Sequence, residues 1–293
     1  MKHMVTAPRH SLDQLLEKDI EGIIIGIEGF AQRSDALYTP KEITPIIKNA
    51  KRHHKTVWLN CNALFHEPDL TTLENVLNTI KTLDFDGLLF ADLAVYSLAE
   101  KLGFTDRLIY YPETYITNPQ DLDFWQKQAI KSAVLARELP LDAIETTAAK
   151  TAFPLTLFGH GYVNMFHSKR RLLKTFFDYT NSTADPTKKT YTIKEELRES
   201  THPIYQDTFG THIFREKPMA SFNVYSQLVP LIDYLIIDSL LIDETRFLTI
   251  VDDYIKIQSQ IDIDIASYSD HDDGFFFKKT IYQQAKETAH HED

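Results

Sequence analysis

The amino-acid sequence predicts an α/β protein built as a TIM-like (β/α) barrel. Short apolar runs alternate with stretches of helical spacing along most of the 293 residues, which is the pattern of successive βα units. The first run, GIIIG at 22–26, is continuously apolar, as strands buried in a parallel sheet are. No linker rich in Pro, Gly or Ser divides the chain. A doubly wound open sheet is the alternative fold, but GIEGF at 26–30 lacks the GxGxxG spacing of its usual phosphate-binding turn.

Seven strands are expected from short runs rich in β-branched, aromatic and other apolar residues. They lie at 23–26, 56–60, 86–90, 108–111, 132–135, 154–158 and 234–238. Helical spacing follows these runs, and Pro40 marks the start of one helix. Helices are expected at 39–51, 70–83, 94–101, 119–129, 141–147, 168–179, 224–231 and 244–260.

The alternation breaks between about residues 181 and 219. Two runs there, 190–193 and 211–214, predict a small β-hairpin excursion instead of another βα unit. The tail contains an acidic turn (SDHDDG) followed by an aromatic, strand-like run. We therefore expect a single barrel domain over 1–293, with an inserted hairpin region at about 181–219 and a C-terminal tail at about 261–293. Whether the barrel is incomplete or decorated stays open.

Composition limits the classes of function. The net charge of −11 argues against a protein that coats nucleic acid non-specifically, although it leaves room for one local basic patch. The lone cysteine, Cys61, excludes structural disulfides and any thiolate-held cluster or cysteine-based zinc site. We find no signal peptide and no apolar run of membrane-spanning length, so a cytoplasmic protein without a membrane partner is expected.

Polar residues follow nearly every expected strand, and in a barrel these positions form the face where active sites are built. They are Glu28 and Arg33, Asn60 and Asn62, Asp92, Glu113, Thr114 and Asn118, Arg137 and Glu138, His160, and Asp238. Each alone fits a helix cap or a loop hydrogen bond. Together they predict a polar pocket. Adjacent strand residues point to opposite faces, so only one of Arg137 and Glu138 enters the barrel mouth unless the strand has already ended.

The stretch FGHGYVNMFHSKRR at 158–171 contains residues that could bind a metal ion or an anion. His160 and His167 have no third ligand in view, so a zinc site is not expected. The basic residues that follow (Lys169, Arg170, Arg171 and Lys174) stand at the start of an expected helix, where positive charge opposes the helix dipole. Such a placement favours an anionic ligand, and a solvated basic turn is the alternative.

The same stretch resembles peptidase family U32, the collagenase-like peptidases. That family carries an apolar strand into His-Gly, then a cysteine, then Ser-Gly-Arg-Cys before a helix. Here the matching residues are His160, Gly161, Ser168 and Arg170, while Asn164 and Arg171 stand at the two cysteine positions and Lys169 at the glycine. LARELPLDAI (135–144), NALFHEPDL (62–70), FADLAV (90–95), ETYITN (113–118), PIYQDTFGTHIF (203–214) and DYLIID (233–238) are similar to other family segments.

The resemblance implies a TIM-like barrel and is strongest to a short, cysteine-poor bacterial form. That form pairs with a longer paralogue and supports 5-hydroxylation of the tRNA wobble uridine, with prephenate as the small acid. Relatives with an iron–sulfur cluster hold it through cysteines, and this chain has none at those positions. No cofactor is therefore expected here, and redox chemistry by this chain alone is in doubt.

Two sets of candidate site residues follow. The candidate catalytic residues are Glu138, His160 and Asp207. The candidate ligand-binding residues are Arg33, Asn62, Asp92, Asn118, Arg137 and Arg170. No metal site is expected. The expected function is a part in prephenate-dependent tRNA hydroxylation, through a small anion or tRNA bound at the barrel mouth; whether the chain is itself an enzyme stays open. The alternatives are a collagenase-like peptidase, although HExxH, GxSxG and P-loop signatures are missing, and a non-catalytic partner of a cluster-bearing paralogue.

Overall fold

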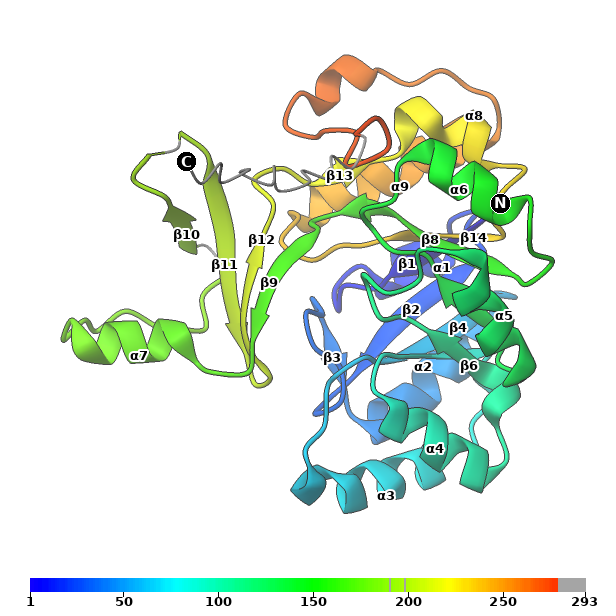
Figure 1. Ribbon diagram of the computed structural model, residues 1–293, viewed down its shortest axis with the longest axis horizontal. Coiled ribbons are helices and arrows are strands. Elements are labelled where there is room, and N and C mark those ends of the chain that lie inside the picture. Colours follow the sequence, from blue (N-terminus) through cyan, green and yellow to red (C-terminus); the bar gives the residue numbers. More distant parts are fainter. Residues whose placement is uncertain (190, 198, 279–293) are drawn as a thin grey trace, which may run out of the picture.

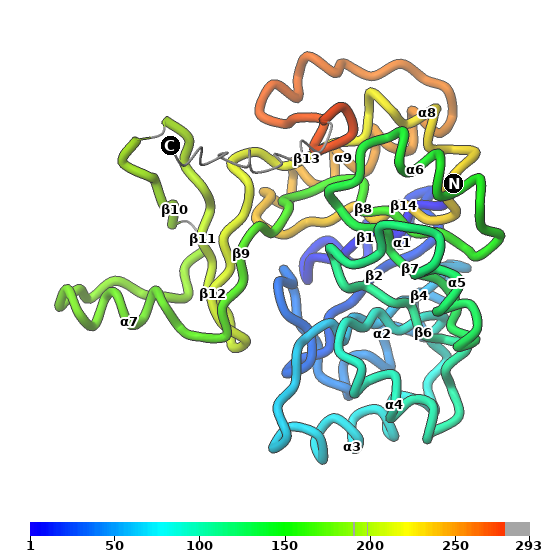
Figure 2. The backbone as a smooth tube through the Cα atoms, viewed as in Figure 1, coloured from blue at the N-terminus to red at the C-terminus, as the bar shows by residue number. Residues whose placement is uncertain are grey.

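The computed structural model describes residues 1–189, 191–197 and 199–278, and within them eight parallel strands close into a barrel (Figures 1 and 2). In order around the ring they are β1 (Lys2–Thr6), β2 (Gly22–Ile27), β4 (Thr56–Cys61), β5 (Gly87–Phe90), β6 (Leu108–Tyr110), β7 (Ser132–Val134), β8 (Leu155–Gly161) and β14 (Tyr234–Ile237). The predicted TIM-like barrel is confirmed, and all seven predicted strands are present.

The eighth strand, β1, was not predicted from the sequence. It pairs in parallel with both β14 and β2 and so closes the barrel. Its five residues begin with a lysine, and the helix that follows, α1 (Leu12–Leu16), has only five residues. In β1 only Met4 and Val5 are apolar, between Lys2, His3 and Thr6, so the sequence shows no apolar run there. Met4 and Val5 are nevertheless fully buried, so β1 contributes to the core like its neighbours.

The predicted helices lie between the strands and around the barrel (Figure 1). They are α2 (Pro40–Arg52), α3 (Leu70–Ile80), α4 (Leu93–Leu102), α5 (Pro119–Lys127), α6 (Leu141–Ala148), α7 (Leu172–Tyr179), α8 (Tyr225–Leu228) and α9 (Glu244–Gln258). In α2, Thr39 and Glu42 form a reciprocal capping box, Pro40 takes the first turn, and Ile43 and Ile47 face the core. None of the described helices is long and apolar enough to cross a membrane.

Residues 164–214 form a second unit, which we call the arm, that projects from the barrel (Figures 1 and 2). It contains α7 and a four-stranded antiparallel sheet in the order β10-β11-β12-β9. The strands are β9 (Asn164–Ser168), β10 (Tyr191–Lys194), β11 (Thr201–Asp207) and β12 (Gly210–Phe214). The predicted hairpin is present, since β11 and β12 pair through the turn at 208–209.

The structure corrects three predicted elements. The helix expected at 168–179 begins only at Leu172, because 164–168 pairs with β12 as strand β9. The helix expected at 224–231 is shorter, a 3₁₀ turn at Phe222–Val224 followed by α8. The aromatic run of the tail, 275–277, lies in turns and not in a strand, because the bidentate pair of Arg215 and Asp272 (3.0 and 2.5 Å) fixes the tail just before it.

Gly22 on β2 lies close to the backbone of β4, and this contact provides a test of barrel packing. A Cβ at Gly22 would lie 2.1 Å from the Thr56 carbonyl oxygen on β4, a backbone atom that cannot rotate away. We expect Gly22→Ala to lower the free energy of unfolding by about 3 kcal/mol or more, as overpacking does. The measurement is urea unfolding at equilibrium.

Gly103 serves as the matched control. It ends α4 at a φ of +76°, and a Cβ there would have no atom within 4 Å. Gly103→Ala therefore meets only the conformational cost of a positive φ, about 1 kcal/mol. Equal losses for the two variants would contradict the close approach of β2 and β4.

Candidate functional site

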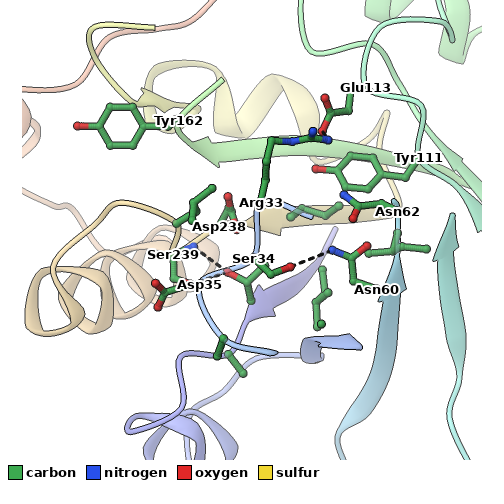
Figure 3. Close-up of a pocket in the computed structure, with 18 of the residues that line it drawn as sticks. Arg33, Ser34, Asp35, Asn60, Asn62, Tyr111, Glu113, Tyr162, Asp238 and Ser239 are labelled. Atoms are coloured by element: carbon green, nitrogen blue, oxygen red, sulfur yellow. Dashed lines mark hydrogen bonds and ion pairs between the residues drawn. The ribbon is translucent and has the colours of Figure 1, made fainter. Parts of the chain in front are cut away.

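A polar pocket lies at the carboxyl ends of the barrel strands, where the sequence predicted one. Its cavity volume is about 40 Å³, and the space between the lining residues is about 590 Å³ when open solvent is included. Its walls come from the ends of strands far apart in the sequence and from one residue of the arm sheet, Phe214. Figure 3 shows the polar lining, with the Arg33 side chain extending toward Glu113 and Tyr111.

Two guanidinium groups share one carboxylate in this pocket. Arg33 Nη2 lies 2.5 Å from Glu113 Oε1, and Arg137 Nη2 lies 3.3 Å from the same oxygen. The side chains of both arginines are 7% exposed and that of Glu113 is 14% exposed. Burial alone raises the pKa of Glu113, but the charges of Arg137 and Arg33 hold it below its ordinary value. The cluster is therefore a carboxylate between two cations.

Backbone strain accompanies this ion pair. Arg33 and Glu113 both have positive φ, 51° and 68°, which is uncommon for residues other than glycine. Two hydrogen bonds hold these conformations: the Arg33 amide donates to Asp207 Oδ2 (3.0 Å), and the Arg137 amide donates to the Glu113 carbonyl (3.0 Å). Strain of this kind persists where the surroundings fix it, most often at binding sites.

Arg137 has bonding capacity left over. Its guanidinium donates to the Tyr111 hydroxyl and lies over the Phe158 ring, 4.0 Å from the centroid. Its Nε is buried and has no hydrogen-bond partner within the described residues. A buried donor without a partner is costly, and a bound ligand or water removes that cost. Burial raises the pKa of Tyr111 to about 12, so its hydroxyl stays protonated.

The two asparagines at the end of β4, Asn60 within the strand and Asn62 just after it, have different roles. Asn60 Nδ2 donates to Ser34 Oγ (3.4 Å), while Asn60 Oδ1 is buried and unpartnered among the described residues. Asn62 lines the pocket too, but its Oδ1 accepts from the Gln32 amide (3.0 Å). Asn62 therefore positions the loop that carries Arg33, whereas Asn60 has an acceptor free for a ligand.

Asp238 adds a titratable group on the opposite wall. Burial raises its pKa to about 6, against the lowering effect of the Arg137 charge and the Thr6 hydroxyl. Asp35 also lines the pocket and adds to the raising effect. Near neutral pH, a nearby negative charge would therefore be enough to protonate Asp238.

The arm completes the pocket from outside. Asp207 on β11 accepts from the Arg33 amide and from His212 Nε2 (3.1 Å) on β12, and His212 Nδ1 lies 3.4 Å from Arg33 Nη1. Burial raises the pKa of Asp207, but His212 and the amide donors keep it low. His167 stacks on His212 with centroids 4.7 Å apart. One face of the arm sheet thus holds Arg33 in place.

The structure brings together only part of the predicted site. Arg33, Arg137 and Asn62 line the pocket, and Asp207 supports Arg33 from behind. The sequence did not single out Tyr111, Asp35 or Tyr162 as lining residues. Tyr111 ends a predicted strand, which was the available signal.

The remaining predicted residues lie elsewhere. Asp92 and Asn118 cap α4 and α5, with Asp92 bound to the Ala94 amide and Asn118 to the Gln120 amide. Glu138 is exposed and does not line the pocket; it lies with Arg137 in the turn after β7, so strand alternation does not set its direction. Arg170 is exposed on the arm.

His160 occupies a separate buried cluster. It is fully buried, its Nδ1 lies 3.3 Å from the Tyr254 hydroxyl, and its ring lies 4.9 Å from that of His271. Burial holds the pKa of His160 well below its ordinary value, so the ring is neutral. Among the described residues there is no group of three or more His, Cys, Asp or Glu suited to a metal ion. Burial also raises the pKa of the Cys61 thiol, and with Asn164 and Arg171 at the family's cysteine positions the residues do not fit a thiolate-held cluster.

Asp238 gives a prediction about pH. An unfolded aspartate titrates near 3.8 and folded Asp238 near 6. The folded protein therefore binds more protons in this window, and Asp238 lowers the free energy of unfolding as the pH rises through it. We expect Asp238→Asn to stabilise the protein by about 1–3 kcal/mol at pH 7.5 and by little at pH 4.5. Urea unfolding at both pH values measures the difference.

Exposed Asp123 on α5 is the matched control, and Asp123→Asn should change the free energy of unfolding by only a few tenths of a kcal/mol at either pH. A gain for Asp238→Asn that is the same at both pH values would contradict the raised pKa.

Comparison with known proteins agrees with this fold. The chain is 24% identical over 294 residues to tRNA hydroxylation protein P2 of Bacillus subtilis, covering 92% of this chain and 94% of that protein. It is 22% identical to tRNA hydroxylation protein P1 of the same organism, over 59% of this chain and 42% of that one. Among solved structures, the U32 peptidase Mk0906 superposes with a TM-score of 0.51 at 14% identity, covering 81% of this chain and 92% of that one, which shows a common fold. The family model for peptidase family U32 matches residues 8–292, and the chain therefore belongs to that family.

Proposed function

We propose that this protein takes part in tRNA modification, namely 5-hydroxylation of the wobble uridine, and that its pocket binds a prephenate-like small acid. The similarity to two proteins named for tRNA hydroxylation supports the process. The observation that carries the ligand is the pair of buried guanidinium groups, Arg33 and Arg137, which share the single carboxylate of Glu113. Two cations with one carboxylate between them leave bonding capacity for a second carboxylate.

We assign a role in ligand binding to three of the lining residues. Arg137, with its unpartnered Nε, binds a ligand carboxylate, and its position over the Phe158 ring limits its side-chain freedom. Asn60 Oδ1 accepts from a hydroxyl of the ligand, because it is the unpartnered acceptor of the lining. Arg33 supplies the second positive charge while Glu113 and Asp207 hold it in place. Pre-formed groups of this kind bind with little loss of side-chain entropy.

Asp238 couples binding to proton uptake. A ligand carboxylate that enters the pocket raises the pKa of Asp238 above its starting value of about 6. Binding of the acid near neutral pH is therefore accompanied by protonation of Asp238, and the affinity rises as the pH falls from about 8 toward 6.

Calorimetric titration of the purified protein with prephenate tests the pocket. Arg137→Met should weaken binding by roughly tenfold or more, because a charge-assisted hydrogen bond is lost. The wild-type affinity should rise between pH 8 and pH 6.5 by up to about tenfold per pH unit, and Asp238→Asn should remove this dependence. Exposed Lys48 on α2 gives the control, Lys48→Met. Unchanged affinity in Arg137→Met would contradict a small-acid site in this pocket.

Deletion of the gene tests the process. Mass spectrometry of bulk tRNA should show loss of 5-hydroxyuridine derivatives in the deletion strain, recovery with the wild-type gene, and no recovery with Arg137→Met. Unchanged 5-hydroxyuridine levels after deletion would contradict a part in tRNA hydroxylation. The alternative of a non-catalytic partner predicts recovery with every pocket variant, together with co-purification of a longer U32 paralogue.

A further inference from the structure

The arm has two faces with different surroundings. Register places Tyr205, Asp207, His212 and His167 on one face, which contacts the barrel mouth through Arg33 and Leu240. The opposite, outer face carries the row of Ile204, Ile213 and Phe166, and α7 covers one end of it. Figure 1 shows α7 and this sheet standing away from the barrel. Of this row, Ile204 is buried and Phe166 is 44% exposed, so the part of the outer face around β9 is open to a partner.

Two cations on the link between β9 and α7 have no internal role. Arg170 and Arg171 are exposed, and no side chain or carbonyl of the described residues bonds to their guanidinium groups. Their neighbours differ: Lys169 Nζ donates to the Leu64 carbonyl (2.7 Å), and Lys174 pairs with Asp178 (2.6 Å). The first amides of α7 are already bonded to Thr211 and Gln206. Positive charges at the N-terminal end of α7 oppose the helix dipole and destabilise the helix slightly. The two arginines are therefore expected to bind a group outside this chain.

Aromatic side chains that precede and follow these arginines in the sequence are exposed. Phe166 on β9 is 44% exposed and Phe176 on α7 is 58% exposed. Leu172, Phe176 and Tyr179, at helical spacing i, i+4 and i+7, form an exposed stripe on α7, while Leu173 and Phe177 face the sheet. Large apolar side chains gathered on an exposed surface mark an interaction site.

Charge decides what this surface binds. Residues 164–180 contain four Lys and Arg and one Asp, a net charge of +3, in a chain whose net charge is −11. Free guanidinium groups interleaved with exposed aromatic rings suit a single-stranded nucleic acid, whose phosphates pair with the cations and whose bases stack on the rings.

We propose that the outer face of the arm is an RNA-binding surface, on which Arg170 and Arg171 hold the backbone phosphates of an unpaired loop and Phe166 and Phe176 stack against its bases. This inference rests on the proposed function, because it names where the tRNA binds. The bond from Lys169 to Leu64 fixes the link against the barrel loop that follows Asn62 of the pocket. RNA held on the arm is thereby placed beside the barrel mouth.

Binding of unfractionated tRNA to the full-length protein, followed by fluorescence anisotropy over a range of salt, tests the cations. Arg170→Ala/Arg171→Ala should weaken binding roughly tenfold and reduce the slope of log K against log salt by about 1.4, or about 0.7 for each phosphate contact. The control, Lys41→Ala/Lys48→Ala, removes two exposed positive charges from α2, outside the arm. It should change the affinity for tRNA and the salt slope only by the small amount that the altered net charge of the protein causes.

The aromatic residues are tested with two RNA probes, a stem–loop of anticodon-arm size and a blunt duplex with the same number of phosphates. Phe166→Ala/Phe176→Ala should weaken binding of the stem–loop at least roughly fivefold and leave duplex binding unchanged, because only unpaired bases stack. Circular dichroism should show an unchanged fold, since both rings are half-exposed.

The outcomes separate this inference from the proposed function. The arm variants should bind prephenate like the wild type, and Arg137→Met should bind tRNA like the wild type. Wild-type affinity for tRNA in Arg170→Ala/Arg171→Ala, or no binding of tRNA by the wild type, would overturn the RNA-binding arm while leaving the pocket untouched. Unchanged RNA binding in Phe166→Ala/Phe176→Ala with loss of a co-purifying protein would assign the surface to a protein partner and overturn it as well.

Discussion

One carboxylate held between two guanidinium groups is the interaction on which the barrel mouth depends. Glu113 follows β6, Arg33 follows β2 and Arg137 follows β7, so the pair of contacts joins three separate strand ends. All three side chains are largely removed from water, and loss of Glu113 would leave two buried cations that repel each other. The closed barrel makes this arrangement possible, because it fixes the strand ends independently of the charges they carry.

The same interaction sets the position of the arm. The Arg33 amide donates to Asp207 and so helps to hold the positive φ of Arg33, and Asp207 also accepts from His212 Nε2 at 3.1 Å. The inner face of the arm sheet therefore packs against a conformation that the pocket also requires. Arg33 belongs to both the pocket and the contact with the arm. A change in its conformation would therefore alter the positive charge in the pocket and also the packing of the arm against the barrel.

Periodicity predicted the fold because seven of the eight barrel strands are mainly apolar and alternate with helices, whereas β1 (KHMVT) has polar residues at both ends and only two apolar residues between them. The helix at 168–179 was predicted to start too early. Residues 164–168 pair with β12, and this tertiary contact is not visible in any local sequence pattern. For the site, position after a strand identified Arg33 and Arg137 but also selected Asp92, whose carboxylate caps a helix. The position of a residue after a strand predicts that it lies at the barrel mouth. Only the direction of its side chain, which the sequence does not show, decides whether it caps a helix or lines the pocket.

The two pairs of arginines differ in their surroundings, and the difference matches two kinds of anion. Arg33 and Arg137 are 7% exposed and rigidly bonded, so their attraction for a carboxylate is little screened, and the pocket admits only a small molecule. Arg170 and Arg171 are exposed and unbonded within the described residues, so each interaction with a phosphate is weak and screened by salt. A nucleic acid has many phosphates, so many weak contacts together give a useful affinity. A small acid makes few contacts, so each of them must be strong. This contrast is the reason why we propose a small acid for the pocket and RNA for the arm.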